Sequence, residues 1–429
     1  MPLFSISPKY LSNIFWLFLD YAFRLIGGYF ITIWLAREIG PANFGIYNYA
    51  TANSSILAAI AVAGLHGVAI KFLVEKKQAH TALMGSAFFI RFGAAIFGYA
   101  CLLLYLLIDN KGLTDKIVLS ILIGFKVMFN PFTVIELYFE AIVKSKFRVF
   151  ARNIAYVIRS LLLVLFILLE WPLLALGFIL LAEEALAVIG LVYFYSKQGY
   201  SLIKWHFNKT YAKEMMREAW PMVISSAGAM LYMKVDQVMI VELLNETEGG
   251  FYAVAVKISE LFSFLPGVLI GTFFPTIVES KSQSKELYHA KMRKLILFML
   301  LIASVLGAGI YIFAHEIVYY SFGADYISAV SIIRIHIWSL ILSFTATVLS
   351  RWLIVEKLTR FSIVRHSFGM VVNIALNFLL IPKFGGEGAA YASIISLFCA
   401  VLLFAAFDKR TFTFLELVFT SFFVFKRNR

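Results

Sequence analysis

Long apolar runs separated by short polar segments make up most of this sequence. A helix needs about 20 mainly apolar residues to cross the hydrocarbon core of a bilayer. Twelve runs approach or exceed this length, and they cover residues 11–36, 44–70, 82–108, 117–143, 153–169, 172–196, 218–244, 251–278, 295–314, 326–354, 361–381 and 387–407. The pattern therefore predicts an all-α polytopic membrane protein with about 12 transmembrane helices.

Lysine and arginine residues gather in alternate loops. They are concentrated before residue 11, at 71–81, 144–152, 197–217, 279–294 and 355–360, and after residue 408. The loops in between hold only Arg37, Lys111, Lys116 and Lys383. Because basic loops stay in the cytoplasm, both termini are predicted to be cytoplasmic. This asymmetry, together with attraction to lipid headgroups, explains the net charge of +13 without nucleic-acid binding.

The second half of the chain repeats the first. The segment GIYNYA at 45–50 matches GFYAVA at 250–255, and each opens a predicted span. Each half has an even number of spans and begins in the cytoplasm, so the repeat is parallel and is expected to enclose a central cavity. We expect a six-helix bundle at 1–200, a cytoplasmic amphipathic linker at 201–217, a second six-helix bundle at 218–410, and a cytoplasmic or interfacial tail at 411–429.

Composition argues for a transporter rather than an enzyme. Apolar residues make up 61% of the chain, against about 45–50% in soluble proteins, and the mean hydropathy is +0.86. The sequence has no Walker A segment, no HExxH and no glycine-rich dinucleotide fingerprint. The seven histidines lack metal-ligand spacing, and both cysteines lie in apolar runs. We therefore expect no catalytic residues, no metal and no cofactor.

Charged side chains nevertheless occur inside the predicted spans. Each costs about 2.5–3.5 kcal/mol at a helix centre, so such residues are expected to face water or one another and to be functional. The cations are Arg24, Arg91, Lys126, Arg159, Lys234, Lys257, Arg334 and Arg351. The acids are Asp20, Glu136, Glu140, Glu183, Glu184, Asp236, Glu242 and Glu260.

The first span carries Asp20 and Arg24 one helical turn apart, near its middle. Two interpretations are open: an internal ion pair that lets the helix insert, or a cation held ready for an anionic substrate. Lys234 and Asp236 point in different directions because they are two residues apart, so at least one of them needs a partner on another helix or on a ligand. Glu183, beside another glutamate, is more simply explained as half of an interhelical pair.

Several segments together carry a family resemblance. They are LAREIGPANFGIYNYA (35–50), GLHGVAIK (64–71), and the series DQVMI, GGFYAVAVKISE and LPGVLIGTFFP between residues 236 and 275. The chain resembles the polysaccharide-biosynthesis flippases, which are bacterial O-antigen repeat-unit translocases of the multidrug/oligosaccharidyl-lipid/polysaccharide exporter superfamily. The related lipid II flippases have an Arg-Asp neighbour pair in the first span and usually two extra spans, which are absent here.

The resemblance implies a flippase that moves undecaprenyl-diphosphate-linked oligosaccharides from the cytoplasmic to the periplasmic leaflet of the bacterial inner membrane by alternating access. It implies a cation-lined cavity for the diphosphate, with membrane lipids and other glycan-assembly proteins as partners. We predict that the substrate-binding residues are Arg24, Arg91, Lys126, Lys234, Lys257 and Arg334. We predict that the residues for ion coupling or pairing are Asp20, Asp236 and Glu183, with H⁺ or Na⁺ as the open choice of coupling ion.

Three alternatives to this interpretation are a related antiporter, a membrane enzyme and a passive scaffold. A drug or metabolite antiporter of the same superfamily would need a mainly acidic and aromatic cavity for cationic drugs, which the eight cations in the spans argue against. A membrane glycan polymerase would carry a large periplasmic loop, and the sequence contains none of that length. A passive assembly scaffold would leave so many costly charges unexplained.

Overall fold

The computed structural model describes the backbone of residues 8–62, 64–108 and 112–423. Side chains are described from Gly27 onwards, apart from Lys77 and the gaps in the backbone, and before it for Trp16 and Arg24. Helices account for all the regular secondary structure in these residues, which contain no strand. The chain divides into two compact units, Met1–Met230 and Leu231–Arg429.

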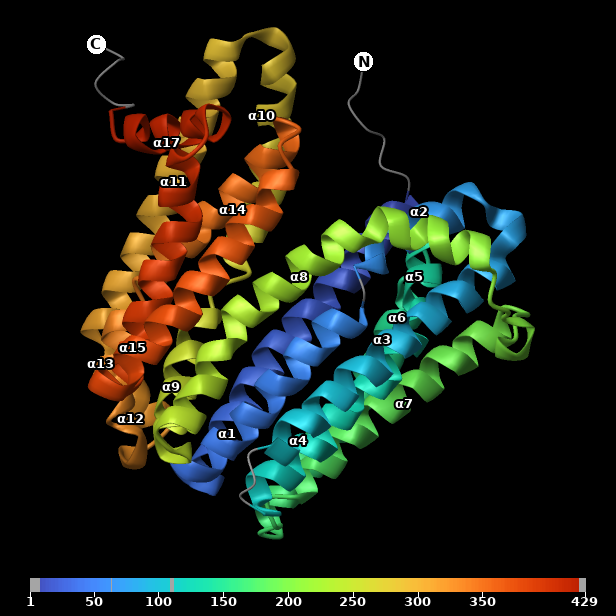
Figure 1. The fold of residues 1–429 in the computed structure, drawn as a ribbon, viewed down its shortest axis with the longest axis horizontal. Helices are drawn as coiled ribbons and strands as arrows, with labels where there is room; N and C mark the ends of the chain where they lie inside the picture. Colours follow the sequence, from blue (N-terminus) through green and yellow to red (C-terminus); the bar gives the residue numbers. More distant parts are fainter. Residues whose placement is uncertain (1–7, 63, 109–111, 424–429) are drawn as a thin grey trace. The chain divides into compact units, whose positions relative to one another are not determined.

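The first unit is a bundle of long helices (Figure 1). α6 and α7 pack side by side along their length, and α1 packs against α3, α4 and α6. The elements are α1 (Pro8–Ala61), α2 (Leu65–Glu75), η1 (Lys77–Ala79), α3 (His80–Ile108), α4 (Asp115–Gly124), η2 (Phe125–Thr133), α5 (Val134–Ala141), α6 (Lys146–Leu168), α7 (Ala175–Lys197), η3 (Leu202–Lys204) and the first part of α8 (Lys209–Leu243).

The second unit is built in the same way. α11 packs against α10, α14 and α17, and α13 packs against α9 and α15. Its elements are the remainder of α8, α9 (Glu246–Glu260), α10 (Leu265–Gln283), α11 (Lys285–Ile312), α12 (Ala314–Ser321), η4 (Ala324–Tyr326), α13 (Ala329–His336), α14 (Ser339–Val355), α15 (Arg360–Phe398), η5 (Cys399–Leu403), α16 (Phe404–Ala406) and α17 (Lys409–Ser421).

Two of the long helices are kinked at a glycine. Gly40 in α1 has φ 74° and Gly385 in α15 has φ 60°, both in the left-handed region that glycine adopts readily. At the first kink Pro41 follows, and its ring excludes the helical conformation for the residue before it. Each kink therefore separates two predicted spans that are otherwise continuous.

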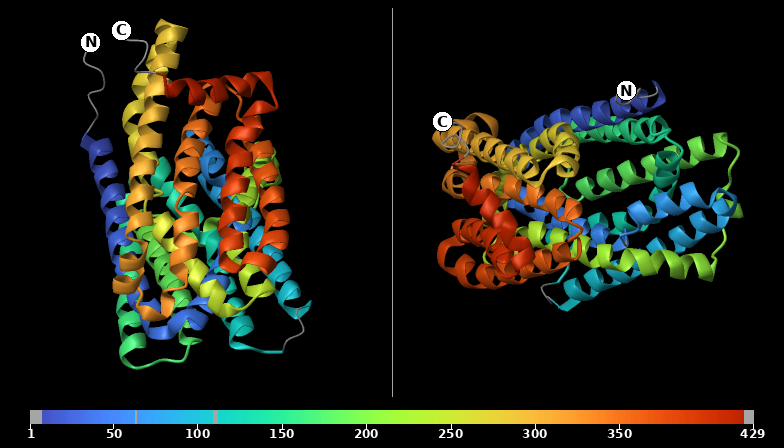
Figure 2. Two further views of the ribbon diagram at one scale, coloured as in Figure 1. Left: turned by 90° about the vertical axis from the view of Figure 1, so that its left-hand side faces the viewer. Right: turned by 90° about the horizontal axis from the view of Figure 1, so that it is seen from above.

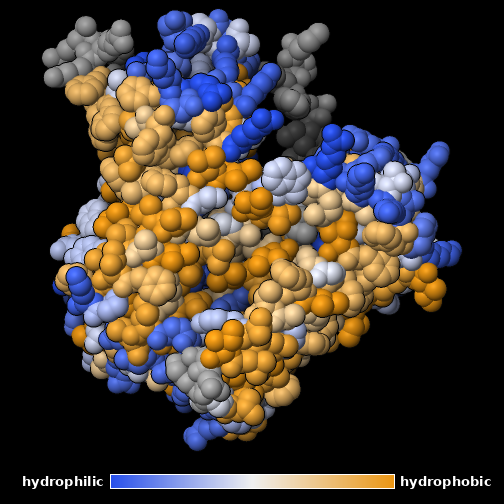
Figure 3. Space-filling model, in the orientation of Figure 1, coloured by the Kyte–Doolittle hydropathy of each residue, from blue (hydrophilic) through white to orange (hydrophobic). Residues whose placement is uncertain are grey.

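The described residues of every predicted span are mostly helical. Nine continuous stretches of the described residues are long and apolar enough to cross a bilayer, and two of these, Gly27–Glu75 and Arg360–Ala406, contain the kinks. α8 holds the predicted span at 218–244. Hydrophobic residues cover much of the sides of the helices, and hydrophilic residues collect at their ends (Figure 3). The chain is thus an all-α, multi-pass membrane protein, as the apolar runs predict.

Helix boundaries differ from the predicted ones where polar turns extend an apolar span. α6 begins at Lys146 rather than at 153, and α11 begins at Lys285 rather than at 295. A helix continues past the hydrocarbon into the headgroup layer, where charged residues are tolerated. An apolar run alone therefore places the start of such a helix too late.

The segment predicted as a linker, 201–217, includes the start of α8, which continues into the following span. Part of the apolar face at the start of α8 is covered by α2. Met215 and Ala219 are fully buried in a core that includes Leu65 and Phe72 of α2. An apolar stripe in a sequence does not by itself show whether lipid or a neighbouring helix covers it.

Two ion pairs also connect the end of α2 to the first part of α8. Lys71 Nζ lies 2.9 Å from Glu218 Oε2, and Lys76 Nζ lies 2.6 Å from Glu214 Oε2. The hydrogen bond from Lys76 to Glu214 raises the pKa of Lys76 above its usual value. The first part of α8 is therefore fixed to the end of α2 within this unit.

The C-terminal tail forms a helix that packs on the second unit. Phe414 is fully buried, and the centre of its ring lies 5.5 Å from that of the Trp352 ring. Leu417 is also buried. Figure 2 shows α17 lying across the ends of neighbouring helices of this unit. At its start Asp408 accepts a hydrogen bond from the Arg410 side chain, which lowers the pKa of the carboxyl group.

The close contact at Gly85 gives a test of this packing. A Cβ there would lie 2.4 Å from the backbone oxygen of His206, so we expect Gly85→Ala to push the connection before α8 away from α3 and to destabilise the protein by about 1–3 kcal/mol. Gly93→Ala on the same helix meets no atom within 4 Å and serves as the control. Unfolding in detergent should distinguish the two, and equal stability would refute this contact.

Candidate functional site

Acidic and basic pairs face each other where α5 meets α6. Glu136 and Glu140 are one turn apart on α5, as are Arg148 and Arg152 on α6, so each pair shares a helix face. A short turn joins the two helices and brings the faces together. Arg148 binds Glu140 through Nη1 and lies 3.4 Å from Glu136 Oε2, while Arg152 Nε donates to Glu136 Oε1 at 2.7 Å.

The alternation of acidic and basic side chains continues beyond these four residues in both directions. Arg152 Nη1 donates to Glu184 Oε2 at 2.8 Å, and Lys126 Nζ lies 3.8 Å from Glu184 Oε1. At the other end His66 Nε2 lies 3.2 Å from Glu140 Oε2. We call this series the charge chain, and its members in order are His66, Glu140, Arg148, Glu136, Arg152, Glu184 and Lys126.

The charge chain runs from an exposed position into the bundle. The His66 side chain is 60% exposed, whereas Glu136 is 13% and Glu184 is 22% exposed. Glu184 is at the centre of its predicted span, 172–196. Charges at this depth are tolerated because each has an opposite charge beside it.

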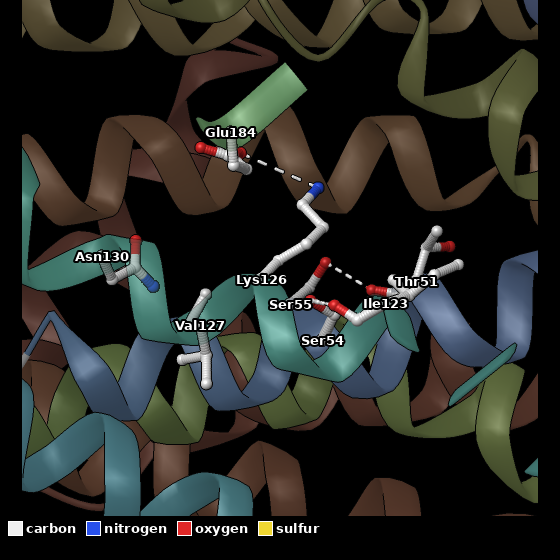
Figure 4. Close-up of a pocket in the computed structure, with 9 residues that line it drawn as sticks. Thr51, Ser54, Ser55, Ile123, Lys126, Val127, Asn130 and Glu184 are labelled. Carbon is white, nitrogen blue, oxygen red and sulfur yellow. Dashed lines mark hydrogen bonds and ion pairs between the residues drawn. The ribbon is translucent and has the colours of Figure 1, made fainter. Parts of the chain in front are cut away.

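A cavity of about 150 Å³ lies at the inner end of the charge chain. Figure 4 shows the Lys126 side chain extending from η2 toward Glu184 on α7, with α1 supplying hydroxyl groups nearby. The space is sufficient for a few water molecules or one small anionic group, and far too small for an oligosaccharide. Its polar lining consists of Thr51, Ser54, Ser55, Lys126, Asn130 and Glu184.

Arg24 lies on α1 among partners from α6. Its Nε donates to Asn153 Oδ1 at 3.2 Å, and its guanidinium carbon lies 5.4 Å from the centre of the Tyr156 ring. The side chain of Asp20 lies outside the described residues, so its predicted pairing with Arg24 stays a prediction. The nearby Glu183 pairs with Arg159, at 3.4 Å between Oε2 and Nε.

Arg91 occupies a different kind of position. Its side chain on α3 is only 1% exposed, and Nη1 donates to Thr133 Oγ1 at 2.6 Å. It does not line the described cavity. This geometry assigns Arg91 a role in holding α3 against η2, beside the acids of the charge chain.

The second unit holds two further polar groups in its interior. Lys234 Nζ lies 2.8 Å from Glu260 Oε1, and Lys257 is close enough to attract the same carboxylate. Asp236 is 5% exposed, and its Oδ2 accepts hydrogen bonds from Tyr252 Oη at 2.6 Å and Ser393 Oγ at 2.5 Å. Lys234 and Asp236 therefore have the separate partners on other helices that their spacing predicts.

The two carboxylate oxygens of Asp236 differ in their hydrogen bonding. Its Oδ1 is buried and has no hydrogen-bond partner among the described residues. A buried carboxylate oxygen without a donor is costly, so this position suits a proton or a small cation.

The predicted substrate-binding residues do not form one cluster within either unit. Lys126 and Arg24 lie near Glu184 in the first unit, and Lys234 and Lys257 lie near Glu260 in the second. Arg334 has an exposed side chain, whose guanidinium carbon lies 5.7 Å from the centre of the Tyr311 ring. Its contact with that ring is distinct from the Lys234–Glu260 pair. Their roles in binding stay predictions.

Sequence reasoning missed the two arginines at the centre of the charge chain. Arg148 and Arg152 were assigned to a cytoplasmic loop because they precede the apolar run of their helix. Their spacing could have revealed them. Two acids four residues apart are followed, after a short connection, by two cations four residues apart, so that the two pairs can face each other. The segment SKFRVFARN at 145–153 also corresponds to LTRFSIVRH at 358–366 in the second half, which pairs Arg152 with Arg365. Arg365 is 4% exposed and donates to Ala346 O and Ser350 Oγ at 3.2 and 3.0 Å.

The sequence profile of the family described as "Polysaccharide biosynthesis protein" matches residues 10–281, which is more than half of the chain. This chain belongs to the polysaccharide biosynthesis protein family. A relative, the probable low-salt glycan biosynthesis flippase Agl15 of Haloferax volcanii, is 26% identical over 211 residues. The match covers 49% of this chain and 44% of Agl15, so it spans less than half the length of that relative.

Solved structures place the fold of this family member among membrane transporters. A multidrug resistance MATE family transporter of the MOP superfamily, in an inward-facing conformation, has a TM-score of 0.70 at 14% identity, with 97% of this chain and 100% of that chain covered. The lipid II flippase MurJ, in an inward closed conformation, also has a TM-score of 0.70 at 14% identity, with 96% and 92% covered. At such low identity these likenesses establish the fold.

A double-mutant cycle tests the charge chain. Removing either partner of a partly buried pair leaves the other charge uncompensated, so Arg152→Gln and Glu136→Gln should each destabilise the protein. The double variant should be more stable than the two losses predict, by about 1–3 kcal/mol of coupling, in denaturant unfolding. Lys71→Gln with Glu218→Gln on the exposed pair is the matched control, and its coupling should stay below about 1 kcal/mol. Additivity in the Arg152–Glu136 cycle would contradict the pairing.

Proposed function

We propose that this protein is a lipid-linked oligosaccharide flippase. In this proposal it moves undecaprenyl-diphosphate-linked glycan repeat units from the cytoplasmic to the periplasmic leaflet of the bacterial inner membrane, by alternating access and with both termini cytoplasmic. The family membership gives the process, polysaccharide biosynthesis. The observation that carries the proposal is the charge chain, which places basic side chains next to acidic ones and ends at a cavity at membrane depth.

The chemistry of the cavity favours a phosphate as the recognised group. Arginine binds phosphate oxygens in a bidentate manner that lysine cannot. Arg152 and Lys126 both contact the Glu184 carboxylate, at 2.8 and 3.8 Å, and of these three side chains Lys126 and Glu184 line the cavity. Hydroxyl and amide groups around them supply further hydrogen bonds. The diphosphate is the part that such lipids share whatever their glycan, while the cavity volume of about 150 Å³ leaves the sugars outside.

The membrane potential favours export of such a substrate. Moving one negative charge outward, away from a negative interior, is favourable by about 2.3 kcal/mol per 100 mV. A diphosphate diester carries about two charges and gains roughly twice this amount. An ion gradient is therefore not required by energetics, although Asp236 offers a place where a coupling proton or sodium ion would bind.

Charge reversal at the cavity tests the proposed function. We expect Lys126→Glu to abolish surface polysaccharide while the protein persists in the membrane, because it places a negative charge in the cavity where phosphate is to bind. We expect the same of Arg24→Glu, which lies outside the cavity lining but puts a second acid near Glu184. Lys204→Glu, at an exposed position before α8, is the control and should leave the glycan unchanged. Gel analysis of extracted glycan beside an immunoblot of membranes gives both readouts. Normal glycan output from Lys126→Glu would remove this cavity from the mechanism.

A second experiment tests ion coupling at Asp236. Asp236→Asn keeps the size of the side chain but removes its charge, so transport into proteoliposomes should lose any stimulation by a Na⁺ or pH gradient. Asp325→Asn, at an exposed position in the same unit, is the matched control and should retain it. A gradient dependence that survives in Asp236→Asn would place coupling elsewhere.

A further inference from the structure

Glu184 connects two cations that belong to different elements. Its Oε2 accepts from Arg152 on α6 at 2.8 Å, and its Oε1 lies 3.8 Å from Lys126 on η2. The carboxylate also forms part of the wall of the cavity. An anionic group thus already occupies the point on which Arg152 and Lys126 converge.

A phosphate that enters this cavity competes with Glu184. Phosphate and carboxylate oxygens accept the same charge-assisted hydrogen bonds from arginine and lysine. The long Lys126–Glu184 contact, 3.8 Å against 2.8 Å for Arg152, is the weaker of the two and the easier one to exchange. Binding of phosphate therefore requires that Glu184 gives up at least one of its cations.

The displaced carboxylate would lie in an unfavourable setting. It would face the negative phosphate, and its neighbour Glu183 is another acid, already bound to Arg159. Arg24 on α1 is the remaining cation near enough to attract it, and it is hydrogen-bonded to Asn153. Two anions side by side in a poorly solvated site favour the neutral form of one of them.

We propose that Glu184 occupies the position of the substrate phosphate in the empty transporter, and that it takes up a proton when the phosphate displaces it. This inference rests on the proposed function and adds to it a residue that couples phosphate binding to proton uptake. Glu184 then also promotes release, because loss of the proton restores the competing carboxylate. The titratable groups farther along the charge chain are Glu136, Glu140 and His66.

Calorimetry on the full-length protein in nanodiscs tests this inference. The probe is farnesyl-diphospho-N-acetylglucosamine, a diphosphate diester with no group of its own that titrates near neutral pH. Titrations in buffers of different ionisation enthalpy report how many protons are taken up on binding. We expect about one proton per ligand for the wild type.

The matched variants are Glu184→Gln and Glu218→Gln. We expect Glu184→Gln to bind the probe about tenfold more tightly, since no carboxylate competes, and to take up almost no proton. Glu218→Gln, which removes an acid from the exposed pair with Lys71, should bind as the wild type does. Slower glycan export by Glu184→Gln should accompany the tighter binding.

The outcomes separate this inference from the proposed function. Binding to the wild type without proton uptake, or uptake that persists in Glu184→Gln, overturns the role of Glu184 and leaves the flippase proposal in place. No binding of the diester to the wild type, at concentrations where a lipid without phosphate also fails to bind, overturns both. The wild-type proton count is decisive even where the variant fails to fold.

Discussion

The high cost of an uncompensated charge inside a membrane governs this structure. A transporter that recognises phosphate needs cations at membrane depth, and the helices that carry them insert only where opposite charges lie nearby. The first unit meets this requirement by alternating acids and bases from His66 to Lys126 across several elements. The same contacts that let these helices coexist with lipid hold Lys126 and Glu184 in the wall of a cavity, with Arg152 bound to that Glu184.

The two units compensate a buried arginine differently at corresponding positions of the repeat. Arg152 is held between two carboxylates, whereas Arg365 is held by a backbone carbonyl and a serine hydroxyl. In the second unit, the buried acid Asp236 accepts hydrogen bonds from two hydroxyl groups and is not paired with a cation among the described residues. This asymmetry agrees with the proposal that the first unit binds the anionic group of the substrate and that the second unit binds a proton or a small cation.

Much of the fold was predictable because apolar runs report membrane spans directly. The kinks at Gly40 and Gly385 follow from local glycine and proline chemistry, and the separate partners of Lys234 and Asp236 follow from helical spacing. The partners of individual charges were less predictable, because they depend on which helices become neighbours. Arg152 was missed for this reason, and so was the burial of Met215 under α2.

The most direct test is the position of the two phosphorus atoms in a structure of the protein bound to a short-chain polyprenyl diphosphate sugar. The account predicts that one phosphate lies within about 4 Å of both the Arg152 guanidinium and the Lys126 ammonium group, with the Glu184 carboxylate moved away from Lys126. Phosphates bound elsewhere, with the Arg152–Glu184 and Lys126–Glu184 contacts unchanged, would contradict it.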